Sequence, residues 1–220
     1  KTIAKFIRRA MDTPIVVGGH HANAAAADII AESAVDFACK GEGEKPLLDL
    51  VERIEAKQDL QFIPNMLTKT AGDQIQVEMK ATGTDGLLAT SGAVAESACS
   101  SDGGSEAKSY FLDDGSLITD NPVKRWVDDL NDLPYEDREI FSYDKIVETR
   151  QGWAEVIATR GCPYACTYCF NVPFFDMYKT DLKGTGDEVK MKDFVRRRSV
   201  DSAIAMLKEV KDTYPNVKYF

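Results

Sequence analysis

The first 60 residues alternate between apolar residues at helical spacing and short unbroken apolar runs. Helical spacing or alanine-rich composition predicts helices over residues 3–11, 24–33 and 46–54. Two apolar runs, residues 14–17 and 35–39, end at glycine-containing turns and predict buried strands. This order of helices and strands is typical of a parallel α/β fold. Because two strands alone do not make a stable sheet of this kind, we expect further strands before the first residue.

Residues 61–150 carry weaker patterns and are interpreted as a connector. Gly, Ala, Ser and Thr occupy 20 of the 29 positions from 81 to 109. So few apolar side chains cannot offset the entropy of ordering the chain, which predicts a flexible insertion over residues 81–109. The alternative is a poorly ordered hairpin that links residues 75–77 to residues 110–112. The sequence Asp-Asp-Gly-Ser at residues 113–116 predicts a tight turn.

A second α/β block is predicted over residues 151–220. Residues 155–159 favour a strand that leads directly into a group of cysteines. Ser199 has the residue type of an N-cap, and apolar residues at helical spacing follow it. Residues 217–220 favour another strand, so the block predicts one βαβ unit.

Charge, hydropathy and cysteine content exclude some classes of binding partner and environment. The formal net charge is −9 and the pI is about 4.8, which argues against binding to nucleic acid or to an anionic membrane surface. The sequence contains no run of 18 apolar residues, so no membrane span is expected. The chain does not begin with Met, and we interpret it as the interior of a longer protein. An odd number of cysteines with one tight group indicates a reducing, cytoplasmic environment and metal ligation rather than disulfides.

Three of the five cysteines lie within eight residues, with the spacing Cys162-x3-Cys166-x2-Cys169. Soft thiolate ligands select zinc, cuprous copper or iron–sulfur clusters. A structural zinc site uses four ligands, and no fourth Cys or His lies near this group. A bacterial ferredoxin run carries a fourth Cys followed by Pro, which is also absent. Three thiolates on a [4Fe–4S] cluster leave one iron open, and an open iron is a site for chemistry.

The segment over residues 159–170, Thr-Arg-Gly-Cys-Pro-Tyr-Ala-Cys-Thr-Tyr-Cys-Phe, resembles the signature of radical S-adenosylmethionine (SAM) enzymes. An aromatic residue before the third cysteine, here Tyr168, and a preceding strand belong to that signature. The resemblance implies that Cys162, Cys166 and Cys169 bind a [4Fe–4S] cluster and that SAM chelates its fourth iron. It implies reductive cleavage of SAM to a 5′-deoxyadenosyl radical, which abstracts hydrogen from a small-molecule substrate. Tyr168 is accordingly a candidate residue near SAM.

Residues 18–21, Gly-Gly-His-His, and residues 41–44, Gly-Glu-Gly-Glu, resemble the end of the cobalamin-binding domain that precedes many radical SAM domains. Residues 121–122 and 129–134 resemble the connector of that subfamily. The resemblance implies that Gly18 and Gly19 let the backbone approach the nucleotide tail of cobalamin, since glycine has no Cβ. The alternative is that this pair only turns the chain at a strand end. The two histidines are expected to lie in a loop near the cleft, not to bind cobalt.

Two further groups of residues lead to expectations. Residues 196–199, Arg-Arg-Arg-Ser, resemble a family segment before the first barrel helix, and an arginine there is suited to pairing with a carboxylate of SAM or substrate. For at least two of these three arginines, however, we expect a solvated basic stretch. Cys39 is expected to be a small buried apolar residue. Cys99 carries no signal of a partner.

Taken with the resemblance, the sequence predicts an α/β chain of three parts. Residues 1–60 are the C-terminal part of a Rossmann-like cobalamin-binding domain, residues 61–150 a connector, and residues 151–220 the first βαβ unit of a radical SAM (β/α) barrel. The expected cofactors are a [4Fe–4S] cluster, SAM and cobalamin, with an electron donor such as flavodoxin or ferredoxin as the protein partner.

The expected reaction is methyl transfer to an unactivated centre, and this chain alone is expected to be inactive. One alternative is radical-driven ring formation of the anaerobic porphyrin cyclase type. Another is a non-catalytic metal-binding or electron-carrier module. No catalytic side chain is assigned.

Overall fold

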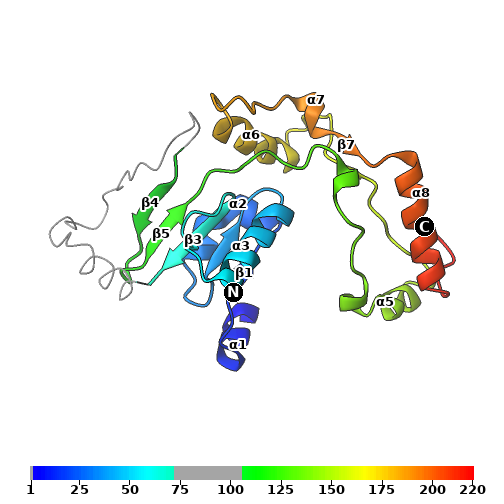
Figure 1. The fold of residues 1–220 in the computed structure, drawn as a ribbon, viewed down its shortest axis with the longest axis horizontal. Helices are drawn as coiled ribbons and strands as arrows, with labels where there is room; N and C mark the ends of the chain where they lie inside the picture. The colour runs from blue at the N-terminus through cyan, green and yellow to red at the C-terminus, as the bar shows by residue number, and fades with distance from the viewer. Residues whose placement is uncertain (1, 72–105) are drawn as a thin grey trace. The chain divides into compact units, whose positions relative to one another are not determined.

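The computed structural model of the chain describes residues 2–71 and 106–220 (Figure 1). Its backbone divides into two compact units. The first unit combines Lys1–Trp126 with Pro173–Val189, and the second combines Val127–Val172 with Lys190–Phe220. Within the described residues, no helix is both long enough and apolar enough to cross a membrane.

The first unit is built on a five-stranded mixed sheet with the order β1-β2-β3-β5-β4. Strands β1 and β2 are parallel, with Val16 opposite Phe37, as the helix–strand order predicts. The remaining neighbours are antiparallel. The strands are β1 (Val16–Val17), β2 (Phe37–Cys39), β3 (Met66–Thr70), β4 (Lys108–Phe111) and β5 (Leu117–Asp120).

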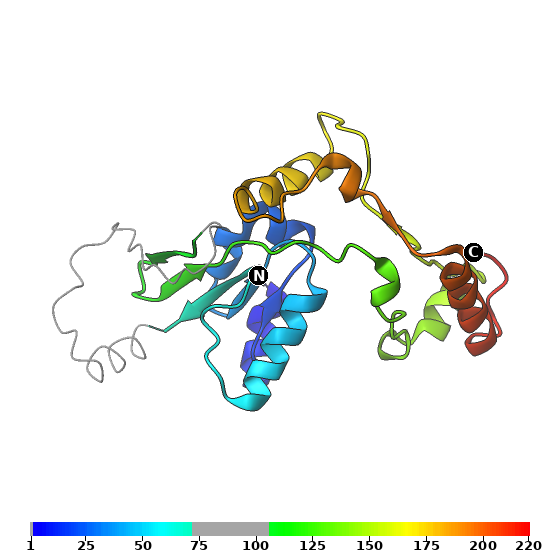
Figure 2. The same cartoon turned by 45° about the horizontal axis from the view of Figure 1, so that its top comes forward.

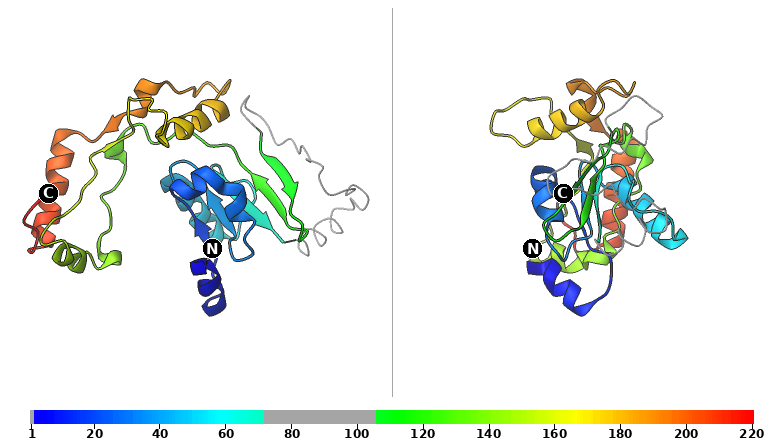
Figure 3. Two further views of the ribbon diagram at one scale, coloured as in Figure 1. Left: turned by 180° about the vertical axis from the view of Figure 1, so that it is seen from behind. Right: turned by 90° about the vertical axis from the view of Figure 1, so that its left-hand side faces the viewer.

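Helices cover both faces of this sheet, as the two flanking layers in the right-hand view of Figure 3 show. They are α1 (Thr2–Ala10), α2 (His20–Ile30) and α3 (Glu44–Ala56). Side chains alternate along β2, so Ala38 joins the cluster with α1 and α2, whereas Phe37 and Cys39 join the cluster with Leu50 of α3. The helices and strands predicted in the first 60 residues are therefore all present, with shifted ends.

Three of the five strands come from the region that the sequence assigns to a connector. Strands β3 and β5 pair along four residues each, and β4 and β5 form a hairpin. The sheet is thus extended by downstream antiparallel strands, which the sequence did not predict. These strands are short and partly polar, and β3 pairs only with strands far from it in the sequence, so its place in the sheet has no local signal.

The hairpin turn at residues 113–116 is confirmed. The amide of Ser116 donates to the Asp114 carboxylate at 2.9 Å, and Gly115 has a φ of 83°. Of the window predicted to be flexible, residues 81–105 lie outside the described part of the chain. Residues 106–109 of this window are described, and Lys108 and Ser109 belong to strand β4, which differs from the predicted flexible insertion. Residues 75–77 of the alternative hairpin also lie outside the described part.

The second unit contains the predicted βαβ elements in reduced form. Helix α8 follows the predicted N-cap, whose Ser199 hydroxyl accepts from the amide of Ser202 at 3.2 Å. Trp153 and Tyr219, on either side of α8 in the sequence, form a parallel bridge. Of residues 155–159, only Thr159 lies in a strand. Its elements are η1 (Leu130–Asp132), η2 (Glu139–Phe141), α5 (Tyr143–Thr149), β6 (Thr159–Arg160), α7 (Met191–Phe194), β7 (Arg196–Arg197) and α8 (Val200–Thr213).

Helices α5 and α8, which lie near each other in Figures 1 and 2, both contribute to a core cluster of this unit. Its described cluster consists of Val147, Ala154, Val210 and Val217. Helix α6 (Asn171–Asp181) begins in the second unit and continues from Pro173 as part of the first. This helix therefore connects the cysteine segment to the unit that holds the sheet.

Candidate metal centre

The start of the cysteine loop is fixed by a close crossing of two backbone segments. Strand β6 pairs with β7, with Thr159 opposite Arg197. Gly161 follows with a φ of 83°, and a Cβ on it would lie 2.6 Å from the carbonyl carbon of Phe194. Only glycine satisfies both the left-handed conformation and this lack of space. The Thr-Arg-Gly part of the motif thus has a local structural reason.

The three cysteines lie on the loop that follows Gly161. Cys162 and Cys169 are half-buried and Cys166 is exposed, and all three are free thiols. The Cys169 amide donates to the Cys166 carbonyl at 3.0 Å, which closes a turn around the shorter spacing. The Cys169 carbonyl in turn accepts from the Val172 amide at 3.3 Å, so Cys169 leads into helix α6.

Free and accessible thiols are the donor chemistry that an iron–sulfur cluster requires. A cluster site also requires the three side chains to converge on one point. In residues 2–71 and 106–220, no group of three or more His, Cys, Asp or Glu side chains is arranged to hold a metal ion. The donor set therefore fits the cluster in kind and accessibility, and its three members are not gathered around one point.

Aromatic residues of the same loop point away from any core. Tyr168 is 91% exposed and Tyr164 is 71% exposed. Burial is what normally favours an aromatic ring, so these two rings gain little from packing within the described chain. Tyr168 thus lies beside Cys169 with its ring available to a ligand or to another part of a protein.

The glycine pair predicted to face a cofactor lies at the end of β1. Gly19 precedes α2 with a φ of 87° and a ψ of −167°, and a Cβ there would meet nothing within 4 Å. At Gly18 a Cβ would lie 3.8 Å from Cys39 Cβ, an ordinary contact. The backbone therefore requires glycine at position 19 and not at position 18. Both glycines and the two following histidines are exposed.

The Gly-Glu-Gly-Glu segment follows β2, and since β1 and β2 are parallel, it lies at the same edge of the sheet as the glycine pair. Gly41 has a φ of 73°, and a Cβ on it would lie 2.7 Å from Asn65 Nδ2 and closer still to the Tyr178 hydroxyl. The Gly41 amide donates to Asn23 Oδ1 at 2.5 Å. Gly41 is thus required by packing within the protein.

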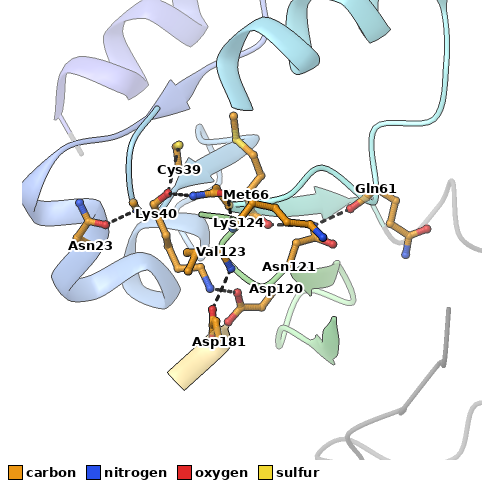
Figure 4. A network of polar contacts seen from close by, with 12 residues as sticks. Asn23, Cys39, Lys40, Gln61, Met66, Asp120, Asn121, Val123, Lys124 and Asp181 are labelled. Carbon is orange, nitrogen blue, oxygen red and sulfur yellow. Dashed lines mark hydrogen bonds and ion pairs between the residues drawn. The ribbon is translucent and has the colours of Figure 1, made fainter. Parts of the chain in front are cut away.

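A polar network holds this segment against the sheet (Figure 4). The Lys40 ammonium pairs with the Asp120 carboxylate, and Asn65 Nδ2 donates to the Lys40 carbonyl at 3.1 Å. Asn121 Nδ2 donates to the Met66 carbonyl at 2.9 Å, which explains the buried Asn that precedes Pro122. Cys39 is buried beside the network. Burial, followed by the negative charge of Glu44, raises the pKa of its thiol to about 11.

Two of the three consecutive arginines are buried, which corrects the expectation of a solvated stretch. Arg196 donates to the Val127 carbonyl at 2.7 Å, and Arg198 donates to the carbonyls of Leu133 and Pro134 at 3.0 and 2.9 Å. Only Arg197 is exposed. Backbone carbonyls accept hydrogen bonds from both of these guanidinium groups. Three consecutive arginines carry no alternating pattern in the sequence, so nothing in it distinguished the two buried residues from the exposed one.

Comparison with solved structures finds a similar fold. One is the radical S-adenosylmethionine methyltransferase TsrM from Kitasatospora setae with cobalamin and a [4Fe-4S] cluster bound, at 17% identity and a TM-score of 0.50. The match covers 96% of this chain and 31% of that chain. Another is the same protein with tryptophan substrate and the SAM analogue aza-SAM bound, at 21% identity and a TM-score of 0.47, covering 96% and 30%. No family model matches the chain, and no curated protein does.

At this identity the likeness establishes the fold and not the function. The mixed α/β architecture of the chain is similar to that of a cobalamin-binding radical SAM methyltransferase. The chain spans about a third of the length of that protein.

Proposed function

We propose that this chain is part of a cobalamin-dependent radical SAM enzyme and that its reaction is methyl transfer to an unactivated centre. The observation that carries the proposal is the Cys162-x3-Cys166-x2-Cys169 spacing on an accessible loop after a strand, within a fold similar to that of TsrM. The proposal concerns the whole protein, of which this chain would supply the cluster loop and one edge of a cobalamin site.

Each proposed site residue has a specific task. Cys162, Cys166 and Cys169 would hold a [4Fe–4S] cluster as thiolates, which leaves one iron without a protein ligand. Tyr168 would lie against SAM. When bound, the cluster supplies the electron that cleaves SAM to a carbon-centred radical, and cobalamin carries the methyl group. Since each cleavage consumes one electron, we also propose a small reduced carrier protein, of the flavodoxin or ferredoxin type, as partner.

The cobalamin part of the proposal concerns the loop after β1. Ligands of open α/β folds bind at the carboxyl ends of parallel strands, where Gly18 and Gly19 are exposed. Gly19 combines a positive φ with open space around its Cα. A bulky cofactor tail can therefore approach the backbone there more closely than at a residue with a side chain.

Anaerobic reconstitution with ferrous iron and sulfide tests the cluster. The chain should bind about four iron atoms, with the visible absorption of a cluster, and each of Cys162→Ala, Cys166→Ala and Cys169→Ala should lose it. Cys39→Ala is the matched control, because Cys39 is buried in another element and should not affect iron content. Full cluster absorption in Cys166→Ala would contradict the assignment.

Reduction with dithionite in the presence of SAM, in the complete protein, separates an enzyme from an electron carrier. A radical SAM enzyme should release 5′-deoxyadenosine and methionine from SAM. A protein that binds the cluster and leaves SAM intact would instead be the electron-carrier alternative. Cobalamin retained after gel filtration then distinguishes the methyltransferase proposal from a radical SAM enzyme without that cofactor.

A further inference from the structure

The two ends of the cysteine loop are anchored in different units. Before the loop, Gly161 is held against Phe194 within the second unit. After the loop, Cys169 is followed by α6, which belongs to the first unit from Pro173 onward. Only three residues separate Cys169 from Pro173. The position of the third thiol is therefore coupled covalently to the way in which α6 packs on the sheet unit.

Tyr178 is one of the buried side chains that hold helix α6 in the first unit. This side chain is fully buried, and its ring packs edge-on against Trp126, with 4.8 Å between ring centroids. The Tyr178 hydroxyl accepts a hydrogen bond from the Glu42 amide at 2.8 Å. The hydroxyl occupies the space that a side chain at position 41 would need, so Tyr178 can pack there only because residue 41 is glycine.

A second contact holds the C-terminal end of the same helix. The Asp181 carboxylate accepts from the Val123 amide at 2.9 Å, as Figure 4 shows. The backbone at residues 40–41 is also held by Asn23 of α2 and by Asn65, through hydrogen bonds to the Gly41 amide and the Lys40 carbonyl. The loop after β2 is thus fixed by several elements of the first unit in addition to α6.

We propose that Tyr178 is a positioning residue for the cysteine loop: it locks α6 onto the Gly41–Glu42 loop and through α6 restrains Cys169. The proposal rests on the proposed function only in calling this segment the cluster loop. It gives Gly41 a task distinct from cofactor binding, because its missing side chain accommodates the tyrosine hydroxyl. In this proposal Tyr178 acts on Cys169 through the helix.

Thiol reactivity in the cluster-free 220-residue chain tests this directly. Cys162 and Cys169 are both half-buried, so their alkylation by iodoacetamide, measured peptide by peptide with mass spectrometry, can be compared within one molecule. Tyr178→Phe removes only the hydroxyl, and Gly41→Ala inserts a Cβ against it. Each should raise the alkylation rate of Cys169 by roughly fivefold, as expected for easier local opening, and leave Cys162 unchanged.

Matched controls exist for both variants. Gly115→Ala places a Cβ at a φ of 83° with nothing within 4 Å, so it imposes similar backbone strain without a clash. Tyr110→Phe removes a buried hydroxyl that has no hydrogen-bond partner among the described residues. Neither control should change the Cys169 rate. Cys39, a buried thiol with a pKa raised to about 11, is the internal reporter of unfolding and should stay unreactive throughout.

An unchanged Cys169 rate in Tyr178→Phe would overturn the proposal. Rapid alkylation of Cys39 in the same variant would overturn it too, because the hydroxyl would then be stabilising the first unit as a whole. After reconstitution with iron and sulfide, Tyr178→Phe should keep its iron but shift the electron paramagnetic resonance g-values of the reduced cluster, a signature that a purely structural role would leave unmoved. Since alkylation is measured without a cluster, it stands or falls independently of the radical SAM assignment.

Discussion

Two adjacent glycines at the end of β1 have different structural requirements. Gly19 adopts a φ of 87° with a ψ of −167°, a region that is essentially restricted to glycine. Gly18 has a negative φ and room for a Cβ at an ordinary distance from Cys39. From sequence alone the two glycines are equivalent, because only the backbone conformation distinguishes them. The structure therefore selects position 19 as the sensitive member of the pair.

We expect Gly19→Ala to lower the free energy of unfolding by about 1–3 kcal/mol, because the new side chain must occupy a conformation that L-residues avoid. Gly18→Ala should change it by no more than about 0.5 kcal/mol, as for an uncrowded exposed site. Urea denaturation monitored by circular dichroism measures both. On the proposed function, Gly19→Ala should also reduce cobalamin per chain in the complete protein, with iron per chain unchanged. Equal effects of the two substitutions on stability and on cobalamin would show that the pair acts only as a turn.

At the scale of elements, patterns confined to one segment were sufficient for some helices and strands. Helix α8 was predicted from the Ser199 cap and the apolar residues after it, and the cap and the helix are confirmed. Of the predicted apolar stripe, Val210 is buried, whereas Val200 and Ile204 are exposed. Strands β1 and β2 were predicted from short apolar runs, since burial on both faces leaves an unbroken apolar sequence. The cysteine spacing was visible for the same reason: all three residues belong to one loop.

Features that depend on a distant partner could not be predicted in this way. Gly41 is required because Tyr178 lies against it, and the two residues are more than 130 positions apart. Strand β3 becomes part of the sheet only through its pairing with β5, whose residues lie about 50 positions further along the chain. Arg196 and Arg198 look like a basic surface run until their carbonyl partners on the segment over residues 127–134 are known.

Arg198 is expected to stabilise the second unit by joining residues 133–134 to the backbone just before α8. Its two nitrogens reach the carbonyls of Leu133 and Pro134, and its guanidinium lies 5.1 Å from the centre of the Tyr135 ring. Arg198→Lys keeps the charge but loses the planar fork, so we expect a loss of about 1–2 kcal/mol in the free energy of unfolding. Arg197→Lys is the matched control, because this neighbour is exposed and should change stability little. Equal losses in the free energy of unfolding of the two variants, measured by urea titration, would contradict the role of Arg198.

At the scale of the whole molecule, the two units differ in how much apolar surface they bury. The first unit packs two buried clusters against its five-stranded sheet, one on α1 and α2 and the other on α3. The second unit has a smaller buried set: the cluster of Val147, Ala154, Val210 and Val217, and the further buried residues Val127, Leu130, Phe194 and Met206. Buried apolar area is the main source of stability, so the first unit should be the more stable. Because α6 belongs to the first unit, the helix after the cysteine loop should share that stability, whereas the cysteines themselves should not.

The chain has two tryptophans, and each reports on one unit. Trp126 is 3% exposed within the first unit, and Trp153 is 54% exposed in the second, where its ring lies 5.0 Å from that of Tyr219. Trp153→Phe leaves a fluorescence signal from Trp126 alone, and Trp126→Phe leaves one from Trp153 alone. We expect the Trp153 signal to change at a urea concentration lower by roughly 1 M, since the midpoint falls with the free energy of unfolding of the unit that is probed. The urea midpoint of the first unit is measured in Trp153→Phe, because Trp126→Phe removes a buried ring from that unit and lowers its stability. If both signals instead change at one concentration, the two units unfold as a single cooperative structure, and the restraint on Cys169 then comes from the whole chain and not from α6.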